Sequence, residues 1–195
     1  MEQNFYNTVE TFVFNSFRNV QKEYEIKHFV RTVFWIKQIH PNVDEAMLVS
    51  AISHDIERAF RMEDMLILKK EFGYADINFY RRHEERGAEI ISEFLKKNGA
   101  KMQFIRKVHL LILTHEEGGN EEQNALKNAD SISFLENNAE DLIERKTELV
   151  GRQKIRNKID WMYTRISCDY AKSIATPYFE KAIDTLNKKH ELLLL

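Results

Sequence analysis

The adjacent pair His54-Asp55 lies in the stretch MLVSAISHDIERAF, whose apolar residues follow helical spacing. Asp55 falls on the apolar stripe of this predicted helix and His54 borders it. A carboxylate that faces a protein core is costly unless it is paired or bound to a cation. Because histidine and aspartate both bind metals, the pair predicts that Asp55 has such a cation as its partner.

Other residues that can bind a metal each lie on a predicted helix of their own, and these are His28, His83, His115 and Asp130. The order along the chain is His, His-Asp, His, His, Asp. A single inward-facing histidine is usually a hydrogen-bonded core residue. Six such residues on five predicted helices instead favour one shared site.

Helix geometry separates the two histidines of the segment 101–117. At about 100° per residue, His115 falls within the apolar stripe of this segment, whereas His109 lies well to its side. We therefore expect His115 to be a ligand and His109 to flank the site.

At this point the sequence resembles the HD-domain superfamily, whose minimal motif is matched by His28, His54, Asp55 and Asp130. The intervening His83 and His115 match the expanded version, which holds two metals. The segments RRHEERGAEII and LKNADSISFLE look like the corresponding parts of HD phosphohydrolases. The resemblance covers about residues 20–137 and implies a helical bundle of the HD-domain type.

The resemblance implies that Asp55 bridges two ions, with His28, His54 and Asp130 on one ion and His83 and His115 on the other. Mixed imidazole and carboxylate ligation points to divalent Fe, Mn, Co, Ni or Zn. A hydroxide between the ions would be the nucleophile. One ion remains an alternative, because His83 and His115 could instead contact the substrate.

Positive side chains accompany the predicted ligands. Arg31, Arg58 and Arg86 each follow a ligand by one helical turn, and Lys127 precedes Asp130 by one turn. Because guanidinium groups grip phosphate oxygens and stabilise charge during phosphoryl transfer, these residues favour a phosphorylated substrate. The alternative is that they form surface pairs with nearby glutamates.

The segment after about Asn138 carries no motif that we can place. Its basic run RKTELVGRQKIRNK, residues 145–158, could line the far side of a pocket, although such runs usually form a solvated face. Aromatic residues such as Tyr80 and Trp161 could stack on a nucleobase, but aromatics at helical spacing are usually core.

Differences between this sequence and the motifs of individual HD enzymes argue against some of their reactions. Those that resemble guanosine-tetraphosphate hydrolases have acidic residues three and four positions after the doublet, where this chain has Arg58 and Ala59. Deoxynucleoside-monophosphate phosphatases have a glutamate at the first of these positions. Glu57 is one position too early and would point elsewhere on a helix. The Gly-Tyr-Pro signature of cyclic-dinucleotide phosphodiesterases is absent.

Composition and periodicity predict an all-α fold. The chain has 195 residues, of which 43% are hydrophobic and 31% charged, with only 6 Gly and 2 Pro. We expect one HD-type domain over residues 1–195, in which helices from 138–195 pack on the motif region. Helices are predicted near 4–21, 25–39, 43–60, 77–98, 101–117, 121–137 and 153–173, with a short one at 62–71 and a last one ending the chain.

The lone Cys168 is expected to be a structural thiol in a reducing compartment. The N-terminus lacks the features of a signal peptide and no apolar run could cross a bilayer, so a cytoplasmic location without membrane contact is expected. A formal net charge of −2 gives no reason to expect duplex nucleic acid as a partner. The terminal leucines could contact a second subunit, so a homo-oligomer is one of the possible states.

The sequence therefore favours a metal-dependent phosphohydrolase that acts on a small phosphorylated, nucleotide-like substrate. The alternative is a di-iron oxygenase, because the same ligand order also resembles HD oxygenases. A third hypothesis is a metal-containing regulator that binds a ligand without turnover. Iron and oxygen dependence would identify the oxygenase, and nucleotide binding without phosphate release would identify the regulator.

Overall fold

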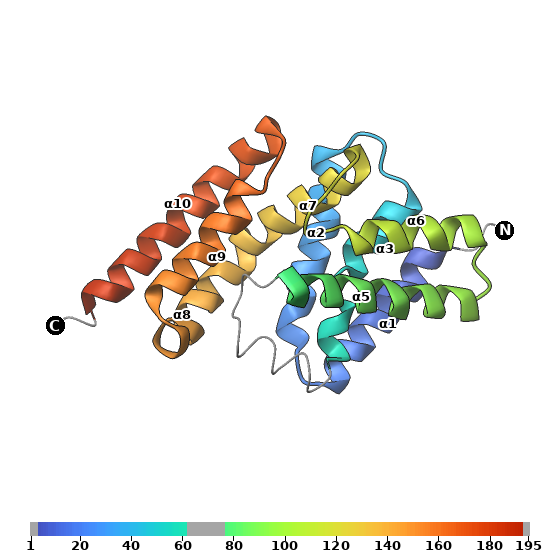
Figure 1. Cartoon of the computed structure of the whole chain (residues 1–195), viewed down its shortest axis with the longest axis horizontal. Coiled ribbons are helices and arrows are strands. Elements are labelled where there is room, and N and C mark those ends of the chain that lie inside the picture. The colour runs from blue at the N-terminus through green and yellow to red at the C-terminus, as the bar shows by residue number, and fades with distance from the viewer. Residues whose placement is uncertain (1–3, 62–76, 193–195) are drawn as a thin grey trace.

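Helices make up all the regular structure of residues 4–61 and 77–192, the parts of the chain that the computed structural model describes (Figure 1). No strand occurs in these two ranges, which confirms the all-α prediction. The helix predicted at 62–71 and the terminal leucines 193–195 lie outside the described residues.

One group of helices encloses the first hydrophobic core, and it consists of α1 (Phe5–Asn19), α2 (Ile26–Ile39), α3 (Glu45–Ser53), α5 (Ile77–Lys97), α6 (Met102–Leu113) and α7 (Glu121–Ser133). Its fully buried side chains include Phe17, Phe29, Ile52, Ile91 and Ile112. Burial of side chains of this size supplies most of the free energy that holds these helices together.

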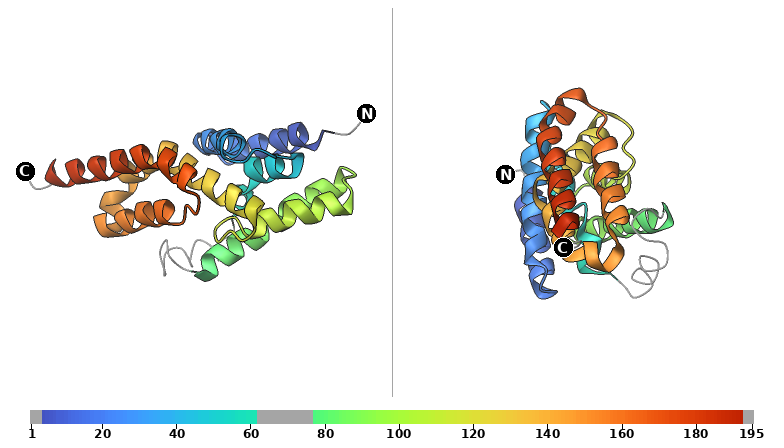
Figure 2. Two further views of the ribbon diagram at one scale, coloured as in Figure 1. Left: turned by 90° about the horizontal axis from the view of Figure 1, so that it is seen from above. Right: turned by 90° about the vertical axis from the view of Figure 1, so that its left-hand side faces the viewer.

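A second group packs around its own core beyond the end of α7. It consists of the π-helical turn η4 (Phe134–Asn138), α8 (Ala139–Val150), α9 (Arg152–Thr164) and α10 (Asp169–Leu192). Figures 1 and 2 show the two groups end to end, with α7 running from one to the other. Trp35 and Ile39 of α2 also pack against the second core, so the groups share apolar contacts.

Several predicted helices end earlier in the structure than their apolar pattern indicates. The segment 43–60 divides into α3 and a short 3-10 helix, η2 (Ile56–Ala59), and the segment 101–117 ends as a helix at Leu113. The segment 153–173 breaks between Thr164 and Asp169. The prediction of continuous helices was wrong at these places, because side chains take part in the hydrogen bonds there: those of His54 and His115 bond backbone carbonyls, and those of Glu84 and Asn128 accept from backbone N–H groups.

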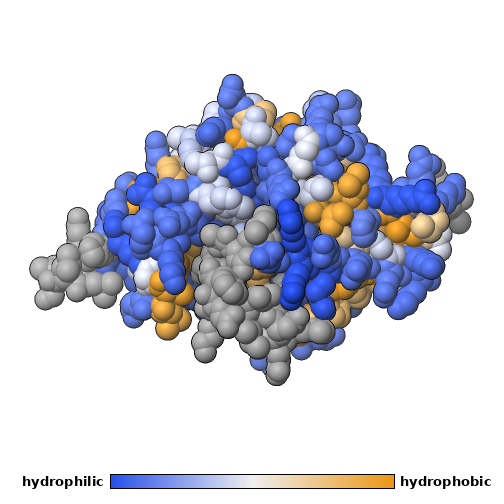
Figure 3. Space-filling model, viewed as in Figure 1, coloured by the Kyte–Doolittle hydropathy of each residue, from blue (hydrophilic) through white to orange (hydrophobic). Residues whose placement is uncertain are grey.

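The surface seen in Figure 3 is largely hydrophilic, with apolar groups scattered over it. Among the described helices, none combines the length and the apolar composition needed to span a bilayer. Cys168 is exposed in the break between α9 and α10, which argues against the structural role expected for its thiol.

Candidate metal centre

Six predicted ligands come together between α2, α3, α5, α6 and α7. His28 lies in the first turns of α2, His83 in α5 and Asp130 in α7, while the others follow the ends of α3 and α6. Each is at most 5% exposed, and they are His28, His54, Asp55, His83, His115 and Asp130. Segments up to about a hundred residues apart thus deliver metal-binding side chains to one buried place.

Two groups of three residues are close enough to hold a metal ion. One is His28, His54 and Asp55, and the other is Asp55, His83 and His115; within each group the ligand atoms lie within 4.8 Å of one another. Asp55 belongs to both, so its carboxylate lies where a ligand shared between two ions would lie.

The two carboxylate oxygens of Asp55 face different groups. Oδ2 lies 3.8 Å from His28 Nε2 and 3.6 Å from His54 Nε2, whereas Oδ1 lies 2.7 Å from His83 Nε2. Asp130 adds a second carboxylate to the first group, with its Oδ1 3.1 Å from His28 Nε2 and 3.4 Å from His54 Nε2. This arrangement could hold one ion or two.

The end of α3 explains how two adjacent residues reach the same site. Neighbours on a helix point about 100° apart, but α3 ends at Ser53 and Asp55 has φ −99° and ψ 15°. The Ala51 carbonyl, which would accept from the Asp55 N–H in a continuing helix, accepts from His54 Nδ1 at 3.0 Å instead. The histidine therefore helps to end the helix that carries it.

His115 is held in the same way after α6. Its Nδ1 donates to the Ile112 carbonyl at 2.7 Å, and the N–H of Glu116 donates to Glu84 at 2.9 Å instead of continuing the helix. The structure thus places His115 at the site, but past the end of α6 instead of on a helix. His109, by contrast, bonds Ser92 through its Nδ1 at 3.1 Å.

Close packing of α5 on the segment from His54 to η2 brings His83 within reach. Gly87 follows His83 by one turn, and a Cβ atom there would lie 3.3 Å from the His54 carbonyl oxygen. Such a contact is tighter than nine in ten real Cβ contacts. Glycine at this position therefore allows the two backbones to approach.

All four histidines use Nδ1 as a donor and direct Nε2 toward the carboxylates. The acceptors of His54 and His115 are backbone carbonyls, which fixes Nδ1 as the protonated nitrogen. His83 Nδ1 donates to Glu57 at 2.8 Å. His28 Nδ1 donates to the hydroxyl of Ser133 at 2.9 Å, since that hydroxyl donates its own proton to the His28 carbonyl.

This orientation fits a metal better than it fits a purely structural cluster. The Nε2 atoms of His54 and His115 are buried and make no hydrogen bond within residues 4–61 and 77–192. Buried polar atoms rarely lack a partner, and metal-binding histidines usually bond protein acceptors through the nitrogen that does not face the metal. The donor set therefore fits one or two divalent transition ions.

Electrostatics keep the ligands in the forms that bind cations. Burial opposes the charge of Asp55, but Arg58 and His54 outweigh it and hold the pKa of Asp55 well below its usual range. Burial likewise opposes the charge of Asp130, while Arg165 and His28 hold its pKa low. Burial lowers the pKa of His115 to about 4, so its imidazole is neutral at pH 7.

Metal binding should strengthen as the pH rises toward about 9. Burial opposes the charge of His83, but Asp55 and Glu57 outweigh it and raise its pKa to about 9, so the metal-free protein holds this imidazole protonated at neutral pH. A metal must displace that proton, which makes the affinity rise by roughly tenfold per pH unit below this pKa. Chelator-competition titrations between about pH 6 and pH 9.5 measure the slope.

Glu57→Gln provides the control for this titration. It removes a carboxylate that holds the proton on His83, so the affinity should level off at a lower pH than in the wild type. An affinity that does not change with pH below about 9 would contradict this account of His83.

Two buried charged side chains beside the candidate ligands escaped prediction, those of Arg165 and Glu57. Arg165 lies just after α9, is paired with Asp130 and Glu116, and also donates to the Ser131 hydroxyl at 2.8 Å. Glu57 accepts from His83 and from Arg61, at distances of 2.5 to 3.1 Å. No local pattern marks Arg165, but the spacing of Glu57 and Arg61 by four residues was a signal that could have been used.

The predicted cations divide into one at the site and three elsewhere. Arg58 NH2 lies 2.8 Å from Asp55 Oδ2, and its NH1 bonds Glu25 at 3.1 Å. Arg31 instead makes two hydrogen bonds to Glu136, at 2.7 and 2.8 Å. Lys127 donates to the Glu117 carbonyl at 3.3 Å. A pocket beside the candidate ligands, described next, has Arg58 in its wall. Arg31, Arg86 and Lys127 are not among its described lining residues.

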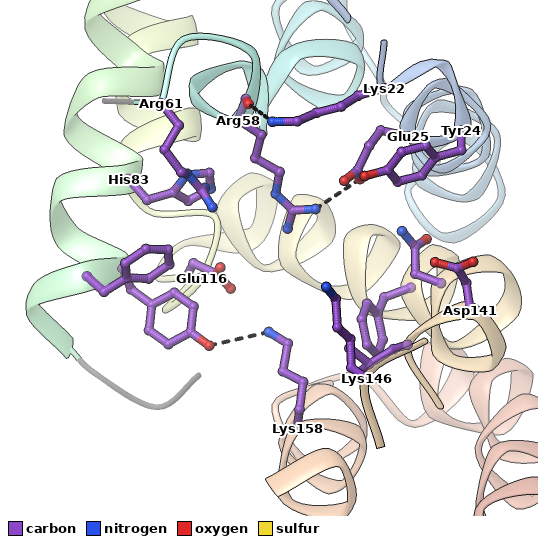
Figure 4. Close-up of a pocket in the computed structure, with 15 residues that line it drawn as sticks. Lys22, Tyr24, Glu25, Arg58, Arg61, His83, Glu116, Asp141, Lys146 and Lys158 are labelled. Atoms are coloured by element: carbon purple, nitrogen blue, oxygen red, sulfur yellow. Dashed lines mark hydrogen bonds and ion pairs between the residues drawn. The ribbon is translucent and has the colours of Figure 1, made fainter. Parts of the chain in front are cut away.

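A pocket of about 370 Å³ lies beside the ligands (Figure 4). His83, Arg58 and Glu116 form part of its wall. His83 is itself a candidate ligand, Arg58 bonds Asp55, and Glu116 shares its partner Arg165 with Asp130. The cationic side chains in its lining are Lys22, Arg58, Arg61, Lys146 and Lys158, and the carboxylates are Glu25, Glu116 and Asp141. Among the described lining residues, positive groups therefore outnumber negative ones.

A family model described as a domain of unknown function (DUF4202) matches residues 13–184, which is most of the chain. The chain belongs to this family. No curated protein and no solved structure matches it. The matched DUF4202 range includes all six ligands as well as Lys158 and Arg165. The candidate centre and its pocket are thus features of the DUF4202 region itself.

Proposed function

We propose that this DUF4202 protein is a metal-dependent phosphohydrolase of the HD-domain type that acts on a small phosphorylated, nucleotide-like substrate. One observation carries the proposal: two groups of buried candidate ligands share Asp55 directly beside a pocket whose described lining has more cationic side chains than carboxylates. Such a pocket concentrates small anions next to the centre.

The metal would be divalent Fe, Mn, Co, Ni or Zn, held by the six ligands. When bound, it would supply a water of lowered pKa and polarise a phosphoryl oxygen. The protein's own part is to keep four imidazoles pointing inward and two aspartates ionised. The hydrogen bonds to Ala51, Ile112, Ser133 and Glu57 perform the first task, and Arg58 and Arg165 perform the second.

Arg58 is the best-placed residue for contact with a phosphoryl group. It bonds Asp55 and Glu25 through different nitrogens and still lines the pocket. A guanidinium has five donors in a planar fork, so it can hold carboxylates while offering other N–H groups to phosphate oxygens. In this position it would stabilise charge that develops on the transferred group.

The nucleotide-like character of the substrate is supported by the aromatic part of the wall. Tyr24, Phe79, Tyr80 and Phe134 line the pocket together with the cations. The Tyr80 ring stacks on Trp161 with centroids 5.1 Å apart, which gives a rigid aromatic surface. A planar base packs well on such surfaces.

Arg58→Ala should lower kcat/KM for a phosphorylated substrate such as p-nitrophenyl phosphate by about 100-fold, because it removes a donor aimed at the reacting group. Arg31→Ala is the matched control, since Arg31 also follows a ligand by one turn but pairs with Glu136 outside the pocket. It should retain activity within about threefold. Phosphate release by both variants, reloaded with each candidate metal, provides the measurement.

Equal activity of the Arg58 and Arg31 variants would contradict the phosphate-binding role of Arg58. The same six ligands also suit the di-iron oxygenase, and oxygen consumption that requires iron, without phosphate release, would favour it over hydrolysis. Nucleotide binding without phosphate release at any metal loading would instead favour the regulator.

A further inference from the structure

Two lysines from the C-terminal helices reach the pocket from the side opposite Arg58. Lys146 belongs to α8 and Lys158 to α9, and Figure 4 shows both side chains directed into the pocket across from Arg58 and His83. The second helical group therefore supplies charge to a site whose metal ligands all come from the first group.

Lys158 holds its ammonium group in an unusual environment. Its Nζ lies 4.1 Å from the Trp161 ring centroid and 5.6 Å from that of Phe134, and it donates to the Tyr80 hydroxyl at 3.4 Å. No carboxylate of the described ranges lies within ion-pair distance. Ring faces attract a cation but do not accept its hydrogen bonds as an anion would. Burial accordingly lowers the pKa of Lys158 to about 8.

The other pocket cations already have protein partners. Arg58 bonds Asp55 and Glu25, Arg61 bonds Glu57, and Lys22 donates to the Arg58 carbonyl at 2.7 Å. Lys146 forms no ion pair within residues 4–61 and 77–192. Among the described cations of the pocket, the two lysines are thus the ones that neither a carboxylate nor a backbone carbonyl holds.

We propose that Lys146 and Lys158 form a second anion subsite, which binds a phosphoryl group of the substrate other than the one that is cleaved. The substrate would then carry two phosphoryl groups separated by a short organic linker. A pocket of about 370 Å³ is large enough for such a molecule. The assignment of the first phosphoryl group to Arg58 rests on the proposed function, whereas the lysine subsite rests on the contacts of Lys158.

Binding of fructose 6-phosphate and fructose 1,6-bisphosphate to the metal-reloaded protein, measured by calorimetry, tests the subsite. The wild type should bind the bisphosphate about tenfold more tightly, as expected for one or two charge-assisted hydrogen bonds. Lys158→Met and Lys146→Met should each lose most of this preference while binding the monophosphate within about twofold of the wild type. Lys158→Arg, which keeps the charge, should retain it.

Lys154→Met is the matched control, because Lys154 is an exposed lysine one turn before Lys158 on α9 and does not line the pocket. It should behave as the wild type. Equal binding of the two sugar phosphates, binding of neither, or a preference that survives both lysine variants would overturn the subsite. Failure of the proposed hydrolysis would look different, since the bisphosphate preference would persist in a protein that releases no phosphate with any metal.

Discussion

Asp55→Asn should remove the bound metal and abolish hydrolysis without unfolding the protein. Asp55 belongs to both ligand groups, and its two oxygens face different histidines. An amide has the same shape but no charge, so the cation loses the ligand on which both groups depend. We expect kcat/KM to fall at least ~1000-fold, because metal activation of water and of the phosphoryl group is lost together.

Asp141→Asn is the matched control for this variant. Asp141 is a carboxylate that lines the same pocket but belongs to neither ligand group. It should keep the wild-type metal content and activity within about threefold. Circular dichroism checks that both variants are folded. An Asp55→Asn protein with wild-type metal content and activity would contradict the assignment of Asp55 as the shared ligand.

Arg165→Met should cause the largest loss of stability of any single change considered. Asp130 and Glu116 are both buried, and Arg165 is paired with each of them, itself only 7% exposed in its side chain. Breaking a buried pair by removing one partner leaves uncompensated charge and costs about 3–5 kcal/mol. For a chain of this length the loss corresponds to a fall in Tm of roughly 6–20 °C. Denaturant unfolding of the metal-free protein measures it.

Metal affinity should fall in the same variant by about 10- to 100-fold, as is typical when a residue that orients a ligand is removed. Arg165→Lys keeps the charge but loses the planar guanidinium that reaches both carboxylates. Its stability and metal affinity should lie between those of the wild type and of Arg165→Met. Arg156→Met is the surface control, because Arg156 pairs with Asp160 on the same helix at a solvent-accessible place. It should change the unfolding free energy by less than about 1 kcal/mol. Equal stability of the Arg165 and Arg156 variants would contradict the buried role.

The six candidate ligands could be singled out from the sequence because they are metal-binding residue types on five predicted helices, in an order that resembles the HD-domain motif. The structure brings all six together. The choice of His115 over His109 followed from helix geometry. It agrees with the placement of His115 beside Asp55 and His83, even though the helix ends two residues before it.

Glu57 could not be placed in this way. On a continuous helix it would point about 200° from Asp55, away from the site. Because α3 ends at Ser53 and η2 begins at Ile56, Glu57 turns back to meet His83 instead. A local hydrogen bond from the His54 side chain to the Ala51 carbonyl accompanies this break, and hydrophobic periodicity alone does not encode it.

The residues from the C-terminal helices were missed for a different reason. Arg165 meets Asp130 only because α9 ends at Thr164 and packs beside α7, so its partner depends on how two hydrophobic cores join. Lys158 belongs to a run that usually indicates a solvated face, yet it lies against Trp161 in the pocket. Arg31 shows the converse. It follows His28 by one turn and was expected at the site, yet its side chain pairs with Glu136 instead.

These six residues are expected to form one metal centre in which two ions share Asp55. Elemental analysis of protein prepared without chelators or a histidine tag, and then reloaded with each candidate metal, tests this expectation most directly. We expect close to two transition-metal ions per chain in the wild type, about one in His115→Ala, and close to none in Asp55→Asn. A folded wild-type protein that binds no metal after reloading would contradict the account.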